Sequence, residues 1–288
     1  MAARAHGGGR LRLNAAVNIL QAFAYPPILR GFVALLVAGC VFPLAGVFIL
    51  RLNLVTLRFT LMHAALLGAA IGLALKIDPL VAGLALDLLT IGAIARVARG
   101  SGLTVGYVST FFMVLTIGLA FAVIYKAGVP AKDAFGILWG SIFSLSRIDL
   151  ALIALYAAAI LLFVTLLFPR VSAVLFDREI AWSSGVGEAG LTTVILVFVG
   201  VSVALLMQLI GALLLDSILL LPAIIASFTA RSTRGFFLQA CIVGAFCSAA
   251  GFFTSLALDV PASSAVTVIA ACLLGAGLIY RRISRRRS

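Results

Sequence analysis

The sequence predicts an all-α integral membrane protein, a polytopic helical bundle of about 8–10 transmembrane helices. Of its 288 residues, 64% are hydrophobic and only 10% are charged, whereas soluble domains carry about a quarter charged residues. The mean hydropathy is +1.26. Long stretches without Asp, Glu, Lys, Arg or His reach the roughly 20 residues that a helix needs to cross about 30 Å of hydrocarbon. Barrel strands would be shorter and would alternate in polarity, so the crossings are helices.

The apolar stretches define the expected crossings in order. They lie at about residues 31–50, 57–75, 79–98, 103–125, 150–169, 189–209, 211–229, 235–257 and 261–280. The boundary from Gln208 to Gly211 is the weakest, because hardly any polar residue separates the sixth crossing from the seventh. Around these crossings the chain divides into a basic or amphipathic N-terminal segment, 1–30, a membrane domain, 31–280, and a basic tail, 281–288.

Basic residues indicate the orientation of the crossings. One side would carry Arg51, Arg58, Arg96, Arg99, Arg170, Arg178, Arg231, Arg234 and the tail RRISRRRS, and the other Lys76, Lys126, Lys132 and Arg147. The positive-inside rule makes the richer side cytoplasmic, so the C-terminus is expected inside. An odd number of crossings leaves Arg4, Arg10 and Arg12 outside, unless residues 11–28 form a further membrane element or two crossings are one broken helix.

Composition and motifs exclude several function classes. The net charge of +12 lies at the edges of the crossings, which argues against nucleic-acid binding. No Gly-rich loop ending in Gly-Lys-Ser or Gly-Lys-Thr occurs, so the chain is not expected to hydrolyse ATP. No paired acid and base or nucleophile constellation indicates a membrane enzyme.

Two loops stand out from the crossings. The outer stretch 126–149 has an apolar centre too short to span, which suggests a re-entrant or interfacial element covered by protein. The inner stretch 176–190 reads FDREIAWSSGVGEAG, with Asp177 and Glu179 placed where acids favour a helix N-terminus, and Gly185 or Gly187 can end such a helix. This short helix is either a connector or a docking element for a soluble motor subunit.

Three ionisable residues lie deepest in the crossings, and each is a candidate for a functional site because burying it is costly. They are His63, Asp87 and Asp216. Imidazole and carboxylate are good ligands for divalent transition metals, and Met62 would add a thioether if it points the same way. His63 could equally be hydrogen-bonded to a neighbouring helix. Asp216 needs a cation, a proton or a hydrogen-bond partner, and Pro222 in the same helix predicts a kink or a local polar site.

Five motifs in order carry a family resemblance over residues 30 to 280. They are AGVFILRLNLVTLRFTLMHAALLGAAIGL, LWGSIFSLSRIDL, FDREIAWSSGV, QLIGALLLDSILLLPAIIA and LDVPASSAVTVIAACL. Together they resemble the bacterial zinc/manganese/iron ABC transporter permeases. The first is similar to that family's Gly-Val-Phe-x-Val-Leu-Arg-Arg followed by Leu-Gly-Asp-Ala-x-Ser-His-Ala.

The resemblance implies a homodimeric permease in the bacterial inner membrane, with its pathway at the two-fold axis. Its implied partners are two cytoplasmic ABC ATPase subunits and a periplasmic metal-binding protein. Zn2+, or Mn2+ or Fe2+, would be the transported substrate, with no tightly bound cofactor. The segment from Phe176 to Gly187, including Asp177, Glu179 and Gly185, would couple the permease to the ATPase.

The chain departs from the family pattern at its polar positions. Phe59 stands where the family commonly has an aspartate four residues before the histidine, and Met62 replaces a serine. Asp216, conversely, stands where the family usually has a small residue. We therefore expect that the carboxylate of the pathway has moved from the second crossing to the seventh, with His63 and Asp216 of both copies forming a transient cation path. A relaxed pathway with no tight site is the alternative.

Other transport readings fit the sequence less well. Permeases for siderophores or cobalamin are longer and would show a wider polar cavity. A proton- or sodium-coupled secondary transporter would be expected to show repeated halves and a carboxylate relay. Zinc is the leading substrate of the divalent metals, although zinc, manganese and iron share nitrogen and oxygen ligands.

Overall fold

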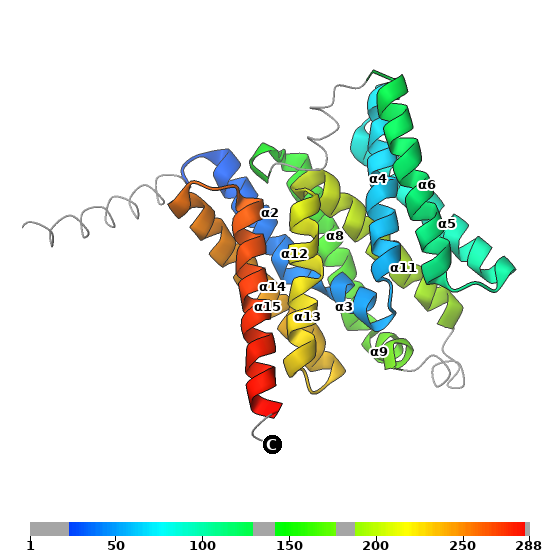
Figure 1. Ribbon diagram of the computed structural model, residues 1–288. Coiled ribbons are helices and arrows are strands. Elements are labelled where there is room, and N and C mark those ends of the chain that lie inside the picture. Colours follow the sequence, from blue (N-terminus) through cyan, green and yellow to red (C-terminus); the bar gives the residue numbers. More distant parts are fainter. Residues whose placement is uncertain (1–22, 129–141, 177–187, 286–288) are drawn as a thin grey trace, which may run out of the picture.

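The computed structural model describes residues 23–128, 142–176 and 188–285. Every regular element in these ranges is a helix (Figure 1). By length and composition, nine stretches of the described residues can cross a membrane, which confirms the predicted class. The elements are α2 (Pro26–Val41), α3 (Pro43–Arg51), α4 (Val55–Leu75), α5 (Pro79–Ser101), α6 (Val105–Lys126), η1 (Ile142–Ser144), α8 (Arg147–Leu166), α9 (Phe168–Phe176), α11 (Glu188–Leu205), η2 (Leu206–Ile210), α12 (Ala212–Leu219), α13 (Leu221–Thr229), α14 (Thr233–Leu258) and α15 (Ala262–Arg285).

The first span consists of two helices, α2 and α3, joined at Phe42. Pro43 opens α3, where its missing N–H costs little because the first turn of a helix has no intrahelical acceptor for it. The N–H of Phe42 still bonds the carbonyl of Ala38 over 2.9 Å. The span begins at Pro26, five residues earlier than predicted, because the preceding Tyr25 has extended backbone and Pro26 sits at the first helical position.

The sixth and seventh spans meet at Gly211. Helix α11 widens into the π-helical turn η2, and α12 starts directly after Gly211. The φ of Gly211 is 110°, a conformation that residues with a side chain rarely adopt. The weakest boundary of the sequence is therefore a true reversal between two spans. The seventh span is itself broken between α12 and α13, since Pro222 lies at the start of α13, as the predicted kink requires.

Helices α4, α5 and α6 pack together at one side of the bundle (Figure 1). The contact between α4 and α5 depends on glycine: a Cβ on Gly68 would lie 2.6 Å from the carbonyl oxygen of Ala82. Only small residues allow helix backbones to approach this closely within lipid. Asp78 caps the start of α5, because its carboxylate accepts the N–H of Leu80 over 2.8 Å.

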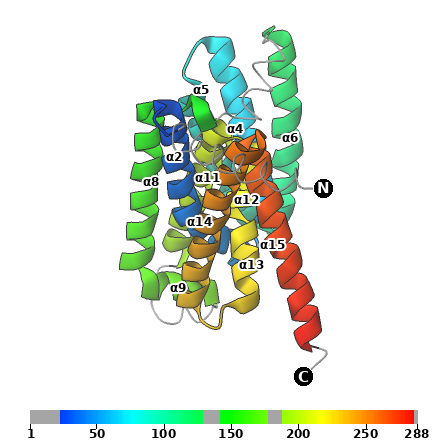
Figure 2. The same cartoon turned by 90° about the vertical axis from the view of Figure 1, so that its left-hand side faces the viewer.

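The remaining spans form the larger part of the bundle. Helices α8, α2, α14 and α15 lie in succession across one side, as Figure 2 shows. Helix α11 packs against both α4 and α5 and so joins the two parts. The first described residues and the C-terminal end of α15 lie at opposite ends of the bundle (Figure 1), as an odd number of spans requires.

The loop 126–149, predicted to lie on the outer side, is described only at its edges. The short helix η1 packs against α2, with Ile142 buried. Ser146 and Asp149 form a reciprocal capping box that begins α8 at Arg147. The predicted re-entrant centre of this loop falls within residues 129–141, which lie outside the described residues.

Candidate functional site

The base of α4 contains a buried arginine. Arg58 stands in the first turn of this helix, and its side chain is 1% exposed. Its guanidinium lies 3.9 Å from the centre of the Phe59 ring, which is a cation–π contact. The sequence had grouped Arg58 with the basic residues at the cytoplasmic edge. The structure adds that its side chain turns into the protein, a burial that the sequence did not predict.

The partner of this buried cation is Asp216. The Nη1 atom of Arg58 and the Oδ1 atom of Asp216 form an ion pair that links α4 to α12. The sequence predicted that Asp216 needs a cation, a proton or a hydrogen-bond partner, and the structure supplies a cation from within the chain. The pair is a finding that sequence reasoning missed. The available signal was the place of Arg58 within the predicted crossing 57–75, since a charge buried in a crossing requires a countercharge.

Asp216 is far more open than its partner. Its side chain is 46% exposed, so one side of the carboxylate faces away from the protomer. The next residue, Ser217, shares a hydrogen bond of 2.7 Å with Thr267 on α15, which fixes α12 against that helix. The Asp216 carboxylate is therefore paired with Arg58 on its buried side and accessible on its other side. The helix that bears it is fixed against α15.

His63 lies on α4, five residues after Arg58, or about 7.5 Å further along the helix axis. Its Nδ1 atom lies 2.7 Å from the carbonyl oxygen of Phe59. Because a carbonyl can only accept, Nδ1 carries the proton, and Nε2 of the neutral ring keeps its lone pair. A hydrogen bond of this kind fixes the tautomer that can bind a metal through Nε2. The ring is half-buried.

The other two candidates of the sequence, Met62 and Asp87, differ in burial. Met62 is half-buried and packs against the apolar core, which is the alternative role expected for one residue of a Met-His pair. Asp87 on α5 is 1% exposed, and neither of its carboxylate oxygens has a hydrogen-bond partner among the described residues. The Nε2 atom of Gln208, from η2, is also buried and has no hydrogen-bond partner in the described part of the chain. It lies directly against Gly83, one turn before Asp87.

The predicted coupling segment is described only at its first residue. Phe176 is the last residue of α9, whereas Asp177, Glu179 and Gly185 lie outside the described residues. The start of α9 is anchored against α14, because the guanidinium of Arg234 lies 5.1 Å from the centre of the Phe168 ring. The ring of Phe237 meets that of Phe168 edge to face at 6.2 Å.

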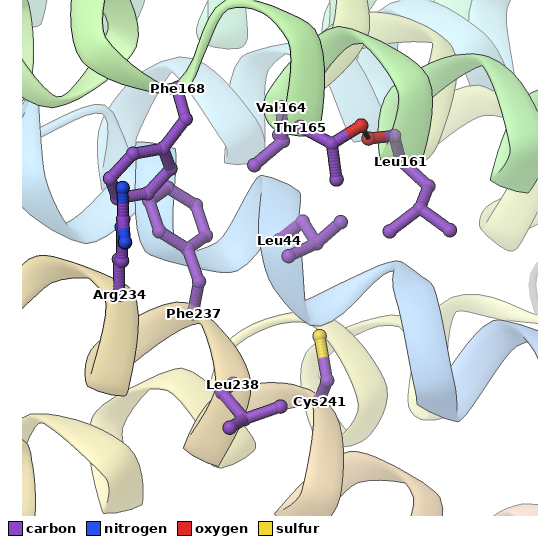
Figure 3. A pocket seen from close by; sticks show the side chains of 9 residues that line it. All are labelled: Leu44, Leu161, Val164, Thr165, Phe168, Arg234, Phe237, Leu238 and Cys241. Atoms are coloured by element: carbon purple, nitrogen blue, oxygen red, sulfur yellow. Dashed lines mark hydrogen bonds between the residues drawn. The ribbon is translucent and has the colours of Figure 1, made fainter.

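These contacts border an apolar cavity of about 340 Å³ between α3, α8, α9 and α14 (Figure 3). In Figure 3 the side chains of Phe168, Phe237 and Arg234 stand together at one end, with Leu44 and Cys241 on facing walls. The lining offers no carboxylate and no imidazole. This cavity therefore concerns the packing of α9 and not the binding of an ion.

Near the start of α4, the possible metal ligands are few and do not form a cluster. No group of three or more His, Cys, Asp or Glu side chains that could hold a metal ion exists within the described ranges. One copy of the chain offers the Nε2 atom of His63 and the open carboxylate of Asp216. Ligands of this number suit transient contact with a cation better than permanent retention, because stable metal sites use about four or more ligands.

Comparisons with known proteins match most of the chain. The sequence model described as the ABC 3 transport family matches residues 24–281. The chain is 23% identical over 257 residues to the high-affinity zinc uptake system membrane protein ZnuB of Haemophilus influenzae, covering 89% of this chain and 97% of that one. It is 23% identical over 247 residues to the manganese import system permease protein ScaB of Streptococcus gordonii, covering 85% and 87%. Among solved structures, it superimposes on a chain of PsaBC from Streptococcus pneumoniae in complex with Fab with a TM-score of 0.80 and 22% identity, covering 91% and 95%.

Proposed function

The chain belongs to the ABC 3 transport family, and from this membership we propose that it is the membrane-spanning permease of an ATP-driven importer of divalent transition metals, with zinc as the leading cargo. The observation that carries the proposal is the match of the family over residues 24–281, which includes all nine candidate spans. Similarity to ZnuB over nearly the full length of both chains favours zinc.

The proposed importer contains three kinds of subunit. Two copies of this chain form a homodimer with the pathway at their shared seam, and two cytoplasmic ABC ATPase subunits supply the energy, so the chain itself is not catalytic. A periplasmic metal-binding protein delivers the ion. The segment from Phe176 through Asp177, Glu179 and Gly185 contacts the ATPase, and the position of Phe176 at the end of α9 supports this, since α9 is packed against the spans through Phe168.

The orientation follows from charge. We place the protein in the bacterial inner membrane with the C-terminus cytoplasmic. Support comes from the ends of the helices: the α13–α14 joint with Arg231 lies at the same end of the bundle as the C-terminus, and the α4–α5 joint with Lys76 lies at the other (Figure 1).

His63 and Asp216 are the proposed ligands of the passing ion. The free Nε2 of His63 and the open oxygen of Asp216 supply one nitrogen and one oxygen from each copy, a mixture that Zn2+ accepts. Met62 contributes a soft wall beside His63. Asp87 is enclosed within the protomer, so we propose no contact between it and the cargo in this conformation.

Manganese is the second candidate cargo. Similarity to ScaB favours it, and so does the carboxylate of Asp216, since oxygen ligands suit Mn2+. Zinc and manganese are separated by measuring the metal content of cells that lack this chain, grown under zinc limitation and under manganese limitation. A deficit confined to one metal identifies the cargo.

Point variants test the pathway. His63→Ala and Asp216→Asn are each expected to lower metal accumulation by at least about tenfold while the protein still reaches the membrane. His6→Ala and Asp259→Asn are matched controls. His6 lies in the N-terminal segment, and Asp259 is an exposed helix cap with a φ of 54°, which asparagine tolerates. Wild-type accumulation by both pathway variants would refute the proposed site.

A further inference from the structure

The two partners of the Arg58–Asp216 pair differ sharply in exposure. The arginine side chain is 1% exposed and the aspartate side chain is 46% exposed. A pair that only tied two helices together would not require this asymmetry. The cation stands behind the carboxylate, and the open face of the carboxylate is the one from which a second cation can approach.

Resting on the function proposed above, we propose that Arg58 is a resident countercation of the cargo ligand Asp216, and that a divalent ion binds by displacing the guanidinium from the carboxylate. Without cargo, the guanidinium neutralises Asp216 and the carboxylate is occupied. With cargo, the metal ion takes its place. Arg58 thus becomes a residue that sets the affinity and the charge selectivity of the pathway.

The ring of Phe59 can stabilise the guanidinium of Arg58 once a metal ion has displaced it from Asp216. Its central carbon already lies 3.9 Å from the centre of the Phe59 ring, and an aromatic face attracts a cation, more strongly where water is excluded. Phe59 therefore stabilises Arg58 in the open state, which explains how one chain can accommodate an arginine beside a path for cations.

The arrangement favours divalent over monovalent ions. A doubly charged ion gains about twice the Coulomb energy of a singly charged ion at the same distance from a carboxylate. A monovalent ion carries the same charge as the Arg58 guanidinium and is attracted to Asp216 no more strongly. A divalent ion is attracted to the carboxylate about twice as strongly and can displace the guanidinium. The apparent affinity for cargo is reduced by the fraction of time that the pair is closed, so removing Arg58 raises it.

The first experiment measures binding by the purified full-length chain in nanodiscs, with Zn2+ alone and with Mn2+ alone. Arg58→Met keeps the length of the side chain but removes its charge. It is expected to lower the apparent Kd for the cargo metal by about tenfold or more and to weaken the discrimination against Na+. Arg58→Lys keeps the charge and is expected to stay near wild type. An unchanged Kd in Arg58→Met would overturn the proposal.

The second experiment exchanges the charges. In Arg58→Asp/Asp216→Arg the ion pair between α4 and α12 is retained, but the exposed partner is now the cation. Because the carboxylate at position 216 is lost, this variant is expected to accumulate no metal while its thermal unfolding stays close to that of wild type. Wild-type accumulation would mean that Asp216 is not a cargo ligand, and both the pathway and the proposal would be wrong.

The outcomes separate this inference from the proposed function. Wild-type accumulation by Asp216→Asn together with His63→Ala would refute the pathway and the inference with it. Loss of accumulation in Asp216→Asn with an unchanged Kd in Arg58→Met would leave the pathway standing and refute the role of Arg58 alone. Unfolding is followed in every variant, because Asp216→Asn leaves a buried arginine without its countercharge.

Discussion

The hydroxyl of Tyr156 on α8 donates a hydrogen bond to the carbonyl oxygen of Phe198 on α11 over 2.7 Å. Ser202, one turn further along α11, donates to the same carbonyl over 2.9 Å and also contacts the Tyr156 hydroxyl. These three groups satisfy each other inside the bundle, where water does not reach them.

Tyr156→Phe removes one donor from this cluster but leaves the carbonyl bonded to Ser202. We therefore expect a modest loss of about 0.5–1.5 kcal/mol in the free energy of unfolding. Denaturation in mixed micelles, followed by circular dichroism, measures it. Metal accumulation should be unaffected, because Tyr156 is remote in function from the α4–α12 pair. A loss of accumulation at wild-type stability would contradict this role.

Gly46 tests the packing of the first span. A Cβ at this position would collide with the carbonyl oxygen of Leu219, so Gly46→Ala should destabilise the protein by about 1–3 kcal/mol, as overpacking does. Gly275→Ala is the matched control, because a Cβ on Gly275 would meet no atom within 4 Å. There we expect no loss, or a gain of about 0.5–1 kcal/mol from reduced backbone entropy. Equal effects of the two substitutions would contradict the close approach.

The buried carboxyl group of Asp87 is expected to lower the free energy of unfolding. Its carboxyl group is buried without a hydrogen-bond partner among the described residues, and a neutral amide is less costly to bury than a charged group. Asp87→Asn is therefore expected to raise the free energy of unfolding, by about 1–3 kcal/mol. Asp78→Asn serves as the control, since asparagine caps a helix as well as aspartate does. If Asp87→Asn unfolds more easily than wild type, the carboxyl group has a stabilising partner.

The orientation in the membrane can be tested with cysteines. In a background that lacks the four native cysteines, Lys76→Cys should react with an impermeant maleimide added to spheroplasts. Arg231→Cys should react only after the membrane is opened, because the two residues lie at opposite ends of the bundle. The opposite pattern would invert the assignment made from the positive-inside rule.

The spans could be predicted from sequence because a charge-free run of about twenty residues reports directly on the hydrocarbon around it. The nine crossings expected from the sequence correspond one to one to the nine candidate spans found in the described ranges. Their internal breaks were harder to place. Pro222 signalled the break before α13, but no local pattern in the sequence predicted the widening of α11 into η2.

The sequence predicted His63 and Asp216 as residues of the polar site, but it did not predict the ion pair between Asp216 and Arg58. His63 and Asp216 stand out as deep ionisable residues. Arg58 did not, because an arginine near the end of an apolar run resembles one that reaches back to water. Its burial is decided by Asp216, which is distant in sequence and close in space, so only the tertiary structure reveals it.

The breaks in the first and seventh spans lie against each other. Pro43 opens α3 after the first break, and Leu219 ends α12 just before the second. The backbone of Gly46, one turn into α3, rests on the Leu219 carbonyl. Tilting the half-helix that bears Asp216 therefore displaces the carbonyl on which α3 is seated. The two spans are in direct backbone contact at this point, so we expect a change in the angle of α12 to move the first span as well.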